Sequence, residues 1–441
     1  MLVKSADDAF RRGVRIAGLV AGALLCAALT LIKLNIFTFG LPEVPHWLWS
    51  TATRGATSAT RVGNTIVVAS RYNVQALNVQ NGKLFWSVNA EFTEVTAAGP
   101  NTILARDYVR HSVAAYAIKD GAVIWQSSDV ADLMVSPGRV IMLHCRPYGG
   151  QMDQCFLESK DPSTGQNRWT TPAVDAPSSV IISASPPSPS FGFPQTRPVA
   201  AVVGLRSPTG TQMFETANGA LVRTDETLGT ESSYPIGKQL LRSKTEWRDD
   251  GCHYTAGLVD VNTGNTIRDF NELDIHTATG TACRQNYLPV GSNEVFAATA
   301  DHHQLLISVK DGSPVWVGSE DQQVEAIDWP YAVISADRSK FSLVDLRTGA
   351  ASAGWVAPQA DPQFRRVKFA YPYLAVSDFR RIKVYNISHL VPDVSRPPVL
   401  TVDNISTVIG LYPGLLVTGG LVETVHAYEF RPFPWSPPSA T

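Results

Sequence analysis

The stretch of sequence that decides the fold is Ala76-Leu77-Asn78-Val79-Gln80-Asn81-Gly82-Lys83-Leu84-Phe85-Trp86. Its pattern recurs at 115–125, 161–169 and 310–316, and in all four copies Trp follows Gly by four residues. Weaker copies surround Gly219, Gly264 and Gly349. The glycines lie about 37 to 54 residues apart, a spacing at which a sequence repeat marks one structural unit.

Each repeat predicts a small antiparallel sheet. In the first copy, apolar strands are expected at 64–69 and 74–79, and Asn81-Gly82 tolerates the positive φ that a tight hairpin needs. One small sheet cannot bury both faces alone, so the copies must stack around an axis. The inter-blade side chains expected to fill the gaps between neighbouring sheets are Trp86, Trp125, Trp169 and Trp316. We therefore predict an all-β fold, a β-propeller.

The number of blades follows from the strand pairs. About nine pairs can be traced up to residues 424–428, whereas propellers typically have four to eight blades. We predict eight four-stranded blades and leave seven to nine open, because some pairs can be insertions. The last pair lacks an outer strand, and residues 46–50 resemble 83–87. We expect residues 46–51 to pair with 424–430 and close the ring, which removes an exposed sheet edge. The Pro/Ser-rich stretch 171–198 is predicted to be a surface loop.

The N-terminus carries a different signal. Residues 13–30 are apolar or small except for Arg15, and the stretch up to 41 remains largely apolar, which is long enough to span a bilayer. Basic residues precede it, so the N-terminus is expected in the cytoplasm. We predict a cytoplasmic stub at 1–15, a transmembrane helix at 16–40, an extracytoplasmic propeller at 41–430 and a Pro-rich tail at 431–441. This organisation is that of a single-pass cell-membrane protein.

Two other interpretations of the N-terminus fit its residues less well. A cleaved signal peptide also has a basic start and an apolar run, but Lys33 and the apolar residues after it fit a cleavage region poorly. Cys26 as a lipid-attachment site lacks the small residue that normally precedes such a cysteine. We interpret Cys26 as an apolar residue buried in the membrane.

Four cysteines follow the predicted span, and an even number outside the membrane favours disulfides. We predict a bond between Cys145 and Cys155, because 140–145 and 155–159 are expected to form a hairpin whose opposed Cβ atoms come within bonding range. The pairing of Cys252 with Cys283 rests partly on elimination. Four free buried thiols are the competing interpretation.

Neither the charge nor the polar motifs predict a catalytic site. Lys plus Arg total 37 and Asp plus Glu total 39, which argues against a general nucleic-acid binder. Asp301-His302-His303 is a metal candidate, but a solvated turn explains it better. Zinc could be held by His144-Cys145 together with Cys252-His253, but these pairs belong to different blades. We predict no cofactor and no metal. Asn386 and Asn404 begin glycosylation sequons, which matter only in a glycosylating host.

The repeat resembles that of the quinoprotein-type propellers, whose pattern is roughly Ala-Leu-Asp-x-x-Thr-Gly-x-x-x-Trp. The resemblance covers most of the chain beyond residue 46 and implies the propeller fold. Arg223, Arg268 and the displaced Trp355 depart from the pattern. The family contains quinone-dependent dehydrogenases and a lipoprotein that helps to assemble outer-membrane barrels, so the resemblance by itself implies no single activity.

Three hypotheses for function follow. The first is a non-catalytic scaffold that binds protein partners in or at the membrane, in an envelope assembly or secretion complex, because loops on a rigid frame form docking surfaces. The second is a quinone-dependent dehydrogenase, which would need clustered oxygen ligands for calcium and often has adjacent cysteines. The third is a sensor of a small envelope ligand, for which the predicted cytoplasmic part is too short to be an output domain. We favour the scaffold and expect no enzyme activity.

Overall fold

The computed structural model describes most of the chain between His46 and Phe430. The described residues are 46–147, 153–176, 181–183, 199–226, 231–248, 251–270, 273–275, 291–300, 303–336, 340–352, 354, 356, 366–378, 380–388, 398–403, 407–419 and 424–430. Within these ranges no helix is long and apolar enough to cross a bilayer. The predicted transmembrane helix at 16–40, the stub at 1–15 and the tail at 431–441 lie outside the described residues.

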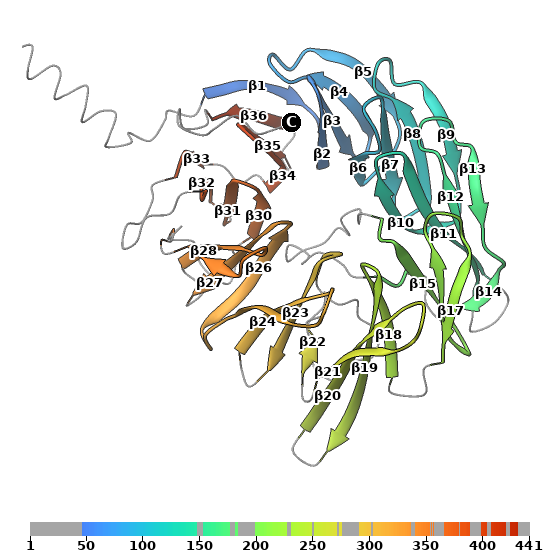
Figure 1. Cartoon of the computed structure of the whole chain (residues 1–441). Helices are drawn as coiled ribbons and strands as arrows, with labels where there is room; N and C mark the ends of the chain where they lie inside the picture. The colour runs from blue at the N-terminus through green and yellow to red at the C-terminus, as the bar shows by residue number, and fades with distance from the viewer. Residues whose placement is uncertain are drawn as a thin grey trace, which may run out of the picture. The chain divides into compact units, whose positions relative to one another are not determined.

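Nine antiparallel sheets follow one another around a ring in the described part of the chain (Figure 1). We call them blades 1 to 9 and give each from its inner to its outer strand. Blade 1 is β2 (Ala56–Val62), β3 (Thr65–Ser70), β4 (Asn73–Asn78) and β5 (Leu84–Asn89). Blade 2 is β6 (Glu94–Ala97), β7 (Thr102–Asp107), β8 (Ser112–Ala117) and β9 (Val123–Ser127). Blade 3 is β10 (Val130–Ser136), β11 (Arg139–Pro147), β12 (Asp153–Lys160) and β13 (Asn167–Thr170), with β14 (Val174–Ala176) also paired to β12.

The middle blades include the least regular sheet. Blade 4 has three strands, β15 (Val202–Ser207), β16 (Gly210–Glu215) and β17 (Leu221–Asp225), and a single bridge from Ile182 to Gly204 stands on its inner side. Blade 5 is β18 (Glu231–Ile236), β19 (Gln239–Arg248), β20 (Gly251–Asp260) and β21 (Thr266–Phe270). Blade 6 is β22 (Asp274–Ile275), β23 (Val295–Ala300), β24 (His303–Ser308) and β25 (Pro314–Val317).

Three further blades complete the ring. Blade 7 is β26 (Gln322–Asp328), β27 (Tyr331–Ala336), β28 (Lys340–Asp345) and β29 (Ala350–Ala351). Blade 8 is β30 (Arg366–Ala370), β31 (Tyr373–Ser377), β32 (Arg381–Asn386) and β33 (Leu400–Asp403). Blade 9 is β34 (Thr407–Tyr412), β35 (Leu415–Gly419), β36 (Thr424–Glu429) and β1 (His46–Ala52).

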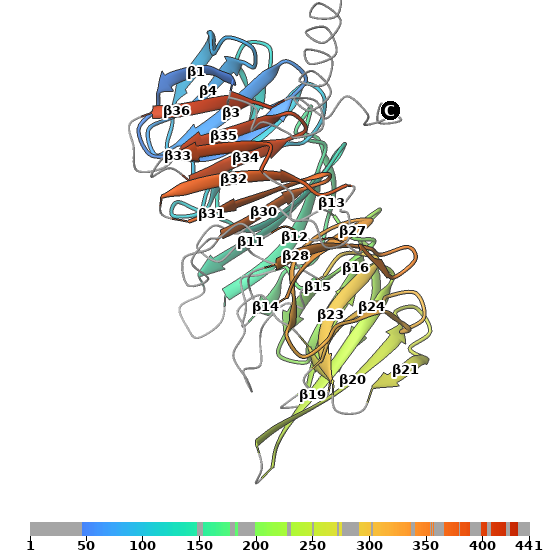
Figure 2. The ribbon, with the colours of Figure 1, turned by 90° about the vertical axis from the view of Figure 1, so that its left-hand side faces the viewer.

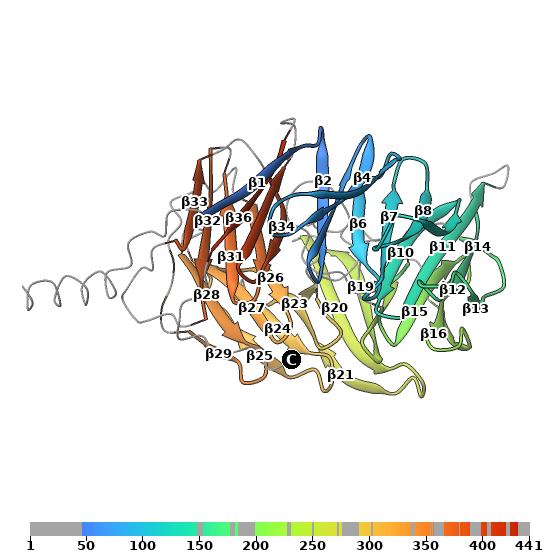
Figure 3. The same cartoon turned by 90° about the horizontal axis from the view of Figure 1, so that it is seen from above.

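Blade 9 confirms the predicted closure of the ring. Its outer strand β1 comes from the other end of the described chain and pairs antiparallel with β36, from His46 opposite Glu429 to Ala52 opposite Thr424. Figure 3 shows β1 lying along β36 beside blade 1. The backbone groups of β36 are thereby bonded on both sides, which removes an exposed edge.

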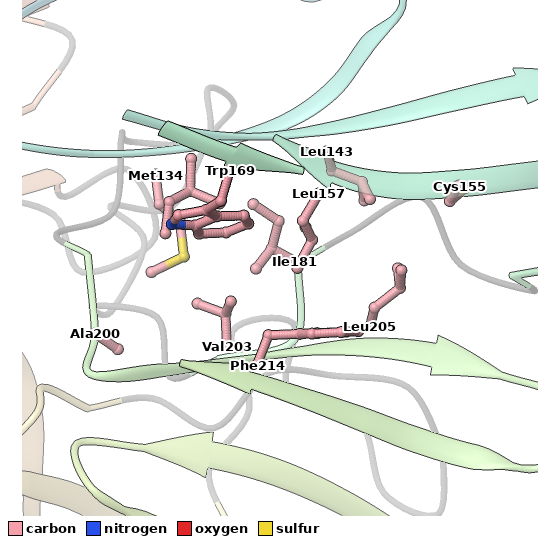
Figure 4. Close-up of a cluster of buried hydrophobic side chains, with 11 residues drawn as sticks. Met134, Leu143, Cys155, Leu157, Trp169, Ile181, Ala200, Val203, Leu205 and Phe214 are labelled. Atoms are coloured by element: carbon pink, nitrogen blue, oxygen red, sulfur yellow. The ribbon is translucent and has the colours of Figure 1, made fainter. Parts of the chain in front are cut away.

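The apolar core is divided among the gaps between blades. In β3, Ile66 and Val68 pack towards blade 9, while Val67 and Ala69 pack towards blade 2, and all four are fully buried. Alternate side chains of a strand point to opposite faces, so one apolar strand serves two cores. The described residues form nine such clusters, one in each gap around the ring. Figure 4 shows the cluster between blades 3 and 4, with Trp169 between the sheets.

The ring therefore has nine blades, one more than the predicted eight and at the upper limit of the range of seven to nine that was left open. Some strand pairs could have been insertions outside the ring. Instead, every sheet buries side chains towards both neighbouring blades. The irregular blade 4 does so through Phe214 towards blade 3 and Met213 towards blade 5. A sheet that fills two gaps in this way is a member of the ring rather than an addition to its surface.

Each blade presents two ends, which we name by the turns they carry. The turn after the inner strand and the turn after the third strand lie on one face, because backbone hydrogen bonds link the two. In blade 1, Val79 NH donates to Asn64 O at 3.0 Å, and in blade 9, Phe430 NH donates to Gly414 O at 3.0 Å. We call this the glycine face, since it carries the glycine of each repeat. The opposite side, where the second and third strands connect, is the hairpin face.

Candidate docking surfaces

Three of the predicted inter-blade tryptophans each dock onto the following blade. The indole NH of Trp86 donates to Ile118 O at 2.7 Å, that of Trp125 to Pro162 O at 2.9 Å, and that of Trp169 to Thr216 O at 3.2 Å. Each ring lies so close to the glycine of the next repeat that a Cβ there would come within 2.6–2.7 Å of it. These tryptophans hold neighbouring blades together.

In the later repeats the glycine faces other groups than a tryptophan ring. Trp316 is buried between blades 6 and 7, but the next glycine, Gly349, is approached by the carbonyl of Val315. Arg223 lies against Gly264 and Arg268 against Gly312, so arginine takes the position of tryptophan in blades 4 and 5. An arginine side chain can cover apolar surface with its methylene groups while its head group stays polar. Trp355 lies outside the described residues.

Cys145 and Cys155 are directly opposed in the β11–β12 register and are joined by a disulfide. Their Cα atoms are 4.1 Å apart. Cys252 lies on β20, where only its backbone is described, and Cys283 lies outside the described residues. The pairing of Cys252 with Cys283 therefore stays a prediction.

The structure places the candidate metal ligands in other roles. His144 contacts Ser128 O through Nδ1 at 3.2 Å and Glu158 Oε2 through Nε2 at 3.0 Å, so both ring nitrogens are engaged. His303 contacts Gly318 O through Nδ1 at 2.9 Å, while Asp301 and His302 lie outside the described residues. Across the described ranges, no three His, Cys, Asp or Glu side chains are grouped closely enough to hold a metal ion.

The two sequons differ in what the structure shows. The Asn386 side chain is buried, and its Oδ1 accepts hydrogen bonds from the NH and hydroxyl of Ser388 at 3.1 and 2.7 Å. Asn404 lies outside the described residues. A buried, bonded amide such as Asn386 is a poor acceptor for a bulky surface glycan.

Buried charges join blades 2 and 3. The Arg106 guanidinium donates to Ala131 O at 2.7 Å, lies 3.5 Å from the Asp132 carboxylate and stacks 4.0 Å from the centre of the Tyr108 ring. The Tyr108 hydroxyl donates to Glu94. Burial, reinforced by the Glu94 charge, raises the pKa of Tyr108 well above its ordinary value. The Arg106 Nε atom is buried without a hydrogen-bond partner among the described residues. Because the guanidinium faces a carboxylate and a carbonyl, we interpret the group as a structural network.

A shallow pocket of about 470 Å³ opens between blades 3 and 4 on the glycine face. Its two arginines are already engaged. Arg139 donates to Thr216 O at 2.6 Å, and Arg168 forms an ion pair with Asp161 at 2.7 Å. These bonds occupy the cationic groups that an anionic ligand would otherwise meet, so the pocket is a weak candidate for a ligand site.

A long ribbon leaves the hairpin face at blade 5. Strands β19 and β20 are each 10 residues long. The pairing of β19 with the inner strand β18 ends at Lys244, and the pairing of β20 with the outer strand β21 ends at Ala256. Residues 245–248 therefore pair only with 251–254, and Thr255 pairs only with Lys244. Figures 1 and 2 show the ribbon extending beyond its sheet. Both of its edges lack a neighbouring strand within the described part of the chain. Unpaired strand edges are sites where another chain can add a strand.

A second surface, which was not predicted from the sequence, lies on the glycine face of blades 7 and 8. The rings of Tyr331 and Tyr371 stack with their centres 3.9 Å apart and their planes at 13°. Trp329 lies in the turn between β26 and β27, two residues before Tyr331, and is 43% exposed. We call Trp329, Tyr331 and Tyr371 the aromatic platform. The signal that could have revealed it is the recurrence of Trp329-Pro330 and Tyr371-Pro372, one repeat apart.

The platform is held by bonds from both blades. The backbone NH of Tyr371 donates to the Asp328 carboxylate at 3.2 Å, which links the turn of blade 8 to that of blade 7. Arg347, on the next turn of blade 7, donates to the Tyr331 hydroxyl at 3.2 Å and forms an ion pair with Asp345 at 2.5 Å. Burial and the neighbouring Tyr331 hydroxyl raise the pKa of Tyr371 to about 12, so it stays a neutral phenol at physiological pH.

Comparisons with known proteins add little to this picture. No protein-family model matches the sequence, and no curated protein matches it. Among solved structures, BamB from Moraxella catarrhalis is 12% identical, with 88% of this chain and 100% of that chain covered and a TM-score of 0.42. Sqt1 from Saccharomyces cerevisiae is 10% identical, with 87% and 98% covered and a TM-score of 0.43. Similarity this low carries no argument about function, so the fold rests on the sheets themselves.

Proposed function

We propose that this protein is a membrane-anchored, non-catalytic propeller that binds a protein partner through its hairpin face. The observation that carries the proposal is the β19–β20 ribbon. Its residues 245–248 and 251–255 extend beyond the sheet with both strand edges unpaired among the described residues. A strand from a partner can add to such an edge by main-chain hydrogen bonds, while the rigid ring beneath keeps the ribbon in place.

Two further features support this function and its location. The hairpin of β11 and β12 opens on the same face and carries the Cys145–Cys155 disulfide. Disulfides persist in oxidising compartments, which supports an extracytoplasmic propeller. The apolar stretch at 16–40 supports an anchor, and its basic flank supports an N-terminus in the cytoplasm.

Site-specific photo-crosslinking in native membranes tests the proposal. A photoreactive amino acid at position 247, on the ribbon, is expected to give a discrete cross-linked protein. The control is position 317, because Val317 is 55% exposed on the outer strand of the neighbouring blade 6. A matched variant replaces residues 245–254 by Asn-Gly and should lose the same partner on purification while its Tm changes little. Identical products from 247 and 317, or a partner retained by the shortened variant, would contradict the proposal.

A further inference from the structure

We propose that the aromatic platform binds a proline-rich segment in the polyproline II conformation, and that this chain's own tail, residues 431–441, is the segment that occupies it. The inference concerns the glycine face and is independent of the ribbon on the hairpin face.

The first step is the shape and chemistry of the platform. Tyr331 and Tyr371 present a stacked pair of rings, and Trp329, two residues before Tyr331 in the chain, is exposed. The Arg347 guanidinium stands 5.4 Å from the centre of the Tyr331 ring. Proline-rich segments dock onto aromatic surfaces of this kind. The proline rings pack on the aromatic faces, and the backbone carbonyls of the segment accept hydrogen bonds from tyrosine, tryptophan or arginine donors.

The second step is that the platform exists before a ligand arrives. The Asp328 carboxylate binds the Tyr371 NH from the neighbouring blade, and Arg347 binds the Tyr331 hydroxyl. These contacts fix the two turns relative to each other, so little side-chain freedom remains to be lost when a segment docks. A ligand that is itself stiff, such as a polyproline II helix, then binds at a low entropic cost.

The third step is where the chain goes after its last strand. The bonds from Leu346 NH to Pro330 O and from Ile387 NH to Pro372 O are equivalent to the bond from Phe430 NH to Gly414 O. Phe430 therefore ends β36 on the glycine face, the face of the platform. Its ring lies 4.7 Å from that of Tyr373, only two residues beyond Tyr371. The described chain thus ends on the glycine face, against the side of blade 8 that packs on blade 9.

The fourth step is the composition and reach of the tail. The eleven residues that follow Phe430 include Pro432, Pro434, Pro437 and Pro438. At about 3.1 Å per residue in polyproline II, eleven residues extend about 34 Å, enough to cross from blade 9 over blade 8 to blade 7. Because the tail is covalently attached, its effective concentration at the platform is on the order of millimolar. A covalently tethered occupant is therefore favoured over a free one.

Binding of a labelled synthetic peptide of sequence 431–441 tests the inference by fluorescence anisotropy. The full chain in detergent is compared with a variant that lacks residues 431–441. We expect the variant to bind the peptide at least about tenfold more tightly, since the full chain already holds its own tail. Trp329→Ala in the shortened chain should weaken binding at least about tenfold, while Trp47→Ala, at another exposed tryptophan on β1, should leave it unchanged.

A peptide with its four prolines changed to alanine provides a readout that needs no change in the protein. It should bind at least about tenfold more weakly, because it loses the preformed conformation. Equal affinity of the full and shortened chains would show that the tail does not occupy the platform, and would overturn the assignment of the tail. Absence of binding to the shortened chain, or equal binding of the alanine peptide, would overturn the platform itself. None of these outcomes depends on the ribbon.

Discussion

At the scale of single residues, the contact of Gly121 with Trp86 joins two blades. Gly121 has a φ of +71°, and a Cβ on it would lie 2.6 Å from the Trp86 ring. Gly121 is thus required for two reasons: its backbone conformation favours glycine, and any side chain there would collide with the Trp86 ring. Arg223 and Arg268 show that tryptophan is not the only side chain that can lie against such a glycine.

The two demands on Gly121 can be measured separately. Gly138 has a similar φ of +75°, but a Cβ there would meet nothing within 4 Å. Gly138→Ala is expected to lower the free energy of unfolding by about 1–2 kcal/mol, from the left-handed backbone alone. Gly121→Ala should lower it by a further 1–3 kcal/mol or so, because the Trp86 ring must shift. Chemical denaturation of both variants checks this, and equal losses would refute the contact.

A second residue-scale prediction concerns pH. Burial alone would raise the pKa of Glu158, but the hydrogen bond from His144 and the charge of Lys160 together lower it below its ordinary value of 4.5. A carboxylate with a lowered pKa in the folded state stabilises the fold above the unfolded pKa, and the stabilisation is lost as pH falls through the folded value. Glu158→Gln should therefore cost about 1 kcal/mol at pH 7.

The difference in the free energy of unfolding between the natural protein and Glu158→Gln should shrink as the pH is lowered below about 4. The control is Glu429→Gln, which makes the same change in net charge at an exposed position of β36. The measurement is the free energy of unfolding of the three proteins between pH 3 and 7. A gap for Glu158→Gln that is constant over this range would show that its ionisation is not linked to folding.

At the scale of elements, β1 completes blade 9 from a distant part of the sequence. Trp49 is 4% exposed, and its indole NH donates to Val79 O of blade 1 at 2.8 Å. The strand thus binds β36 through its backbone and blade 1 through one side chain. These two attachments stabilise closure of the ring by a strand from the N-terminal side, because both blade 9 and blade 1 gain contacts.

Two tryptophans on β1 allow a matched comparison. Trp49→Ala removes a buried ring and is expected to lower the free energy of unfolding by about 3–5 kcal/mol. Trp47→Ala, at a position that is 58% exposed, should change it by no more than about 0.5 kcal/mol. Thermal or chemical unfolding measures both. If the two substitutions cost the same, β1 does not close the ring in solution.

At the scale of the whole molecule, the prediction concerns topology. The basic start and the apolar stretch at 16–40 predict that everything beyond about residue 41 lies outside the cytoplasm. Protease added to intact spheroplasts should therefore digest the propeller and leave a small N-terminal fragment. A cytoplasmic protein of the same host, followed in the same samples, controls for lysis. Complete protection of the propeller would reverse the orientation.

The sequence by itself determined the repeating unit, the closure by residues 46–51 and the tryptophans that join blades 1 to 4, because each follows from a pattern that recurs along the chain. Apolar alternation sets the strands, Gly at the turn sets the hairpin, and Trp four residues later sets the docking distance. Only the tertiary structure decided the number of blades, since that number depends on whether each sheet packs against both neighbours, as Met213 and Phe214 do in blade 4. It also decided the aromatic platform. Tyr331 and Tyr371 lie forty residues apart in the chain and stack only because adjacent blades bring equivalent turns together.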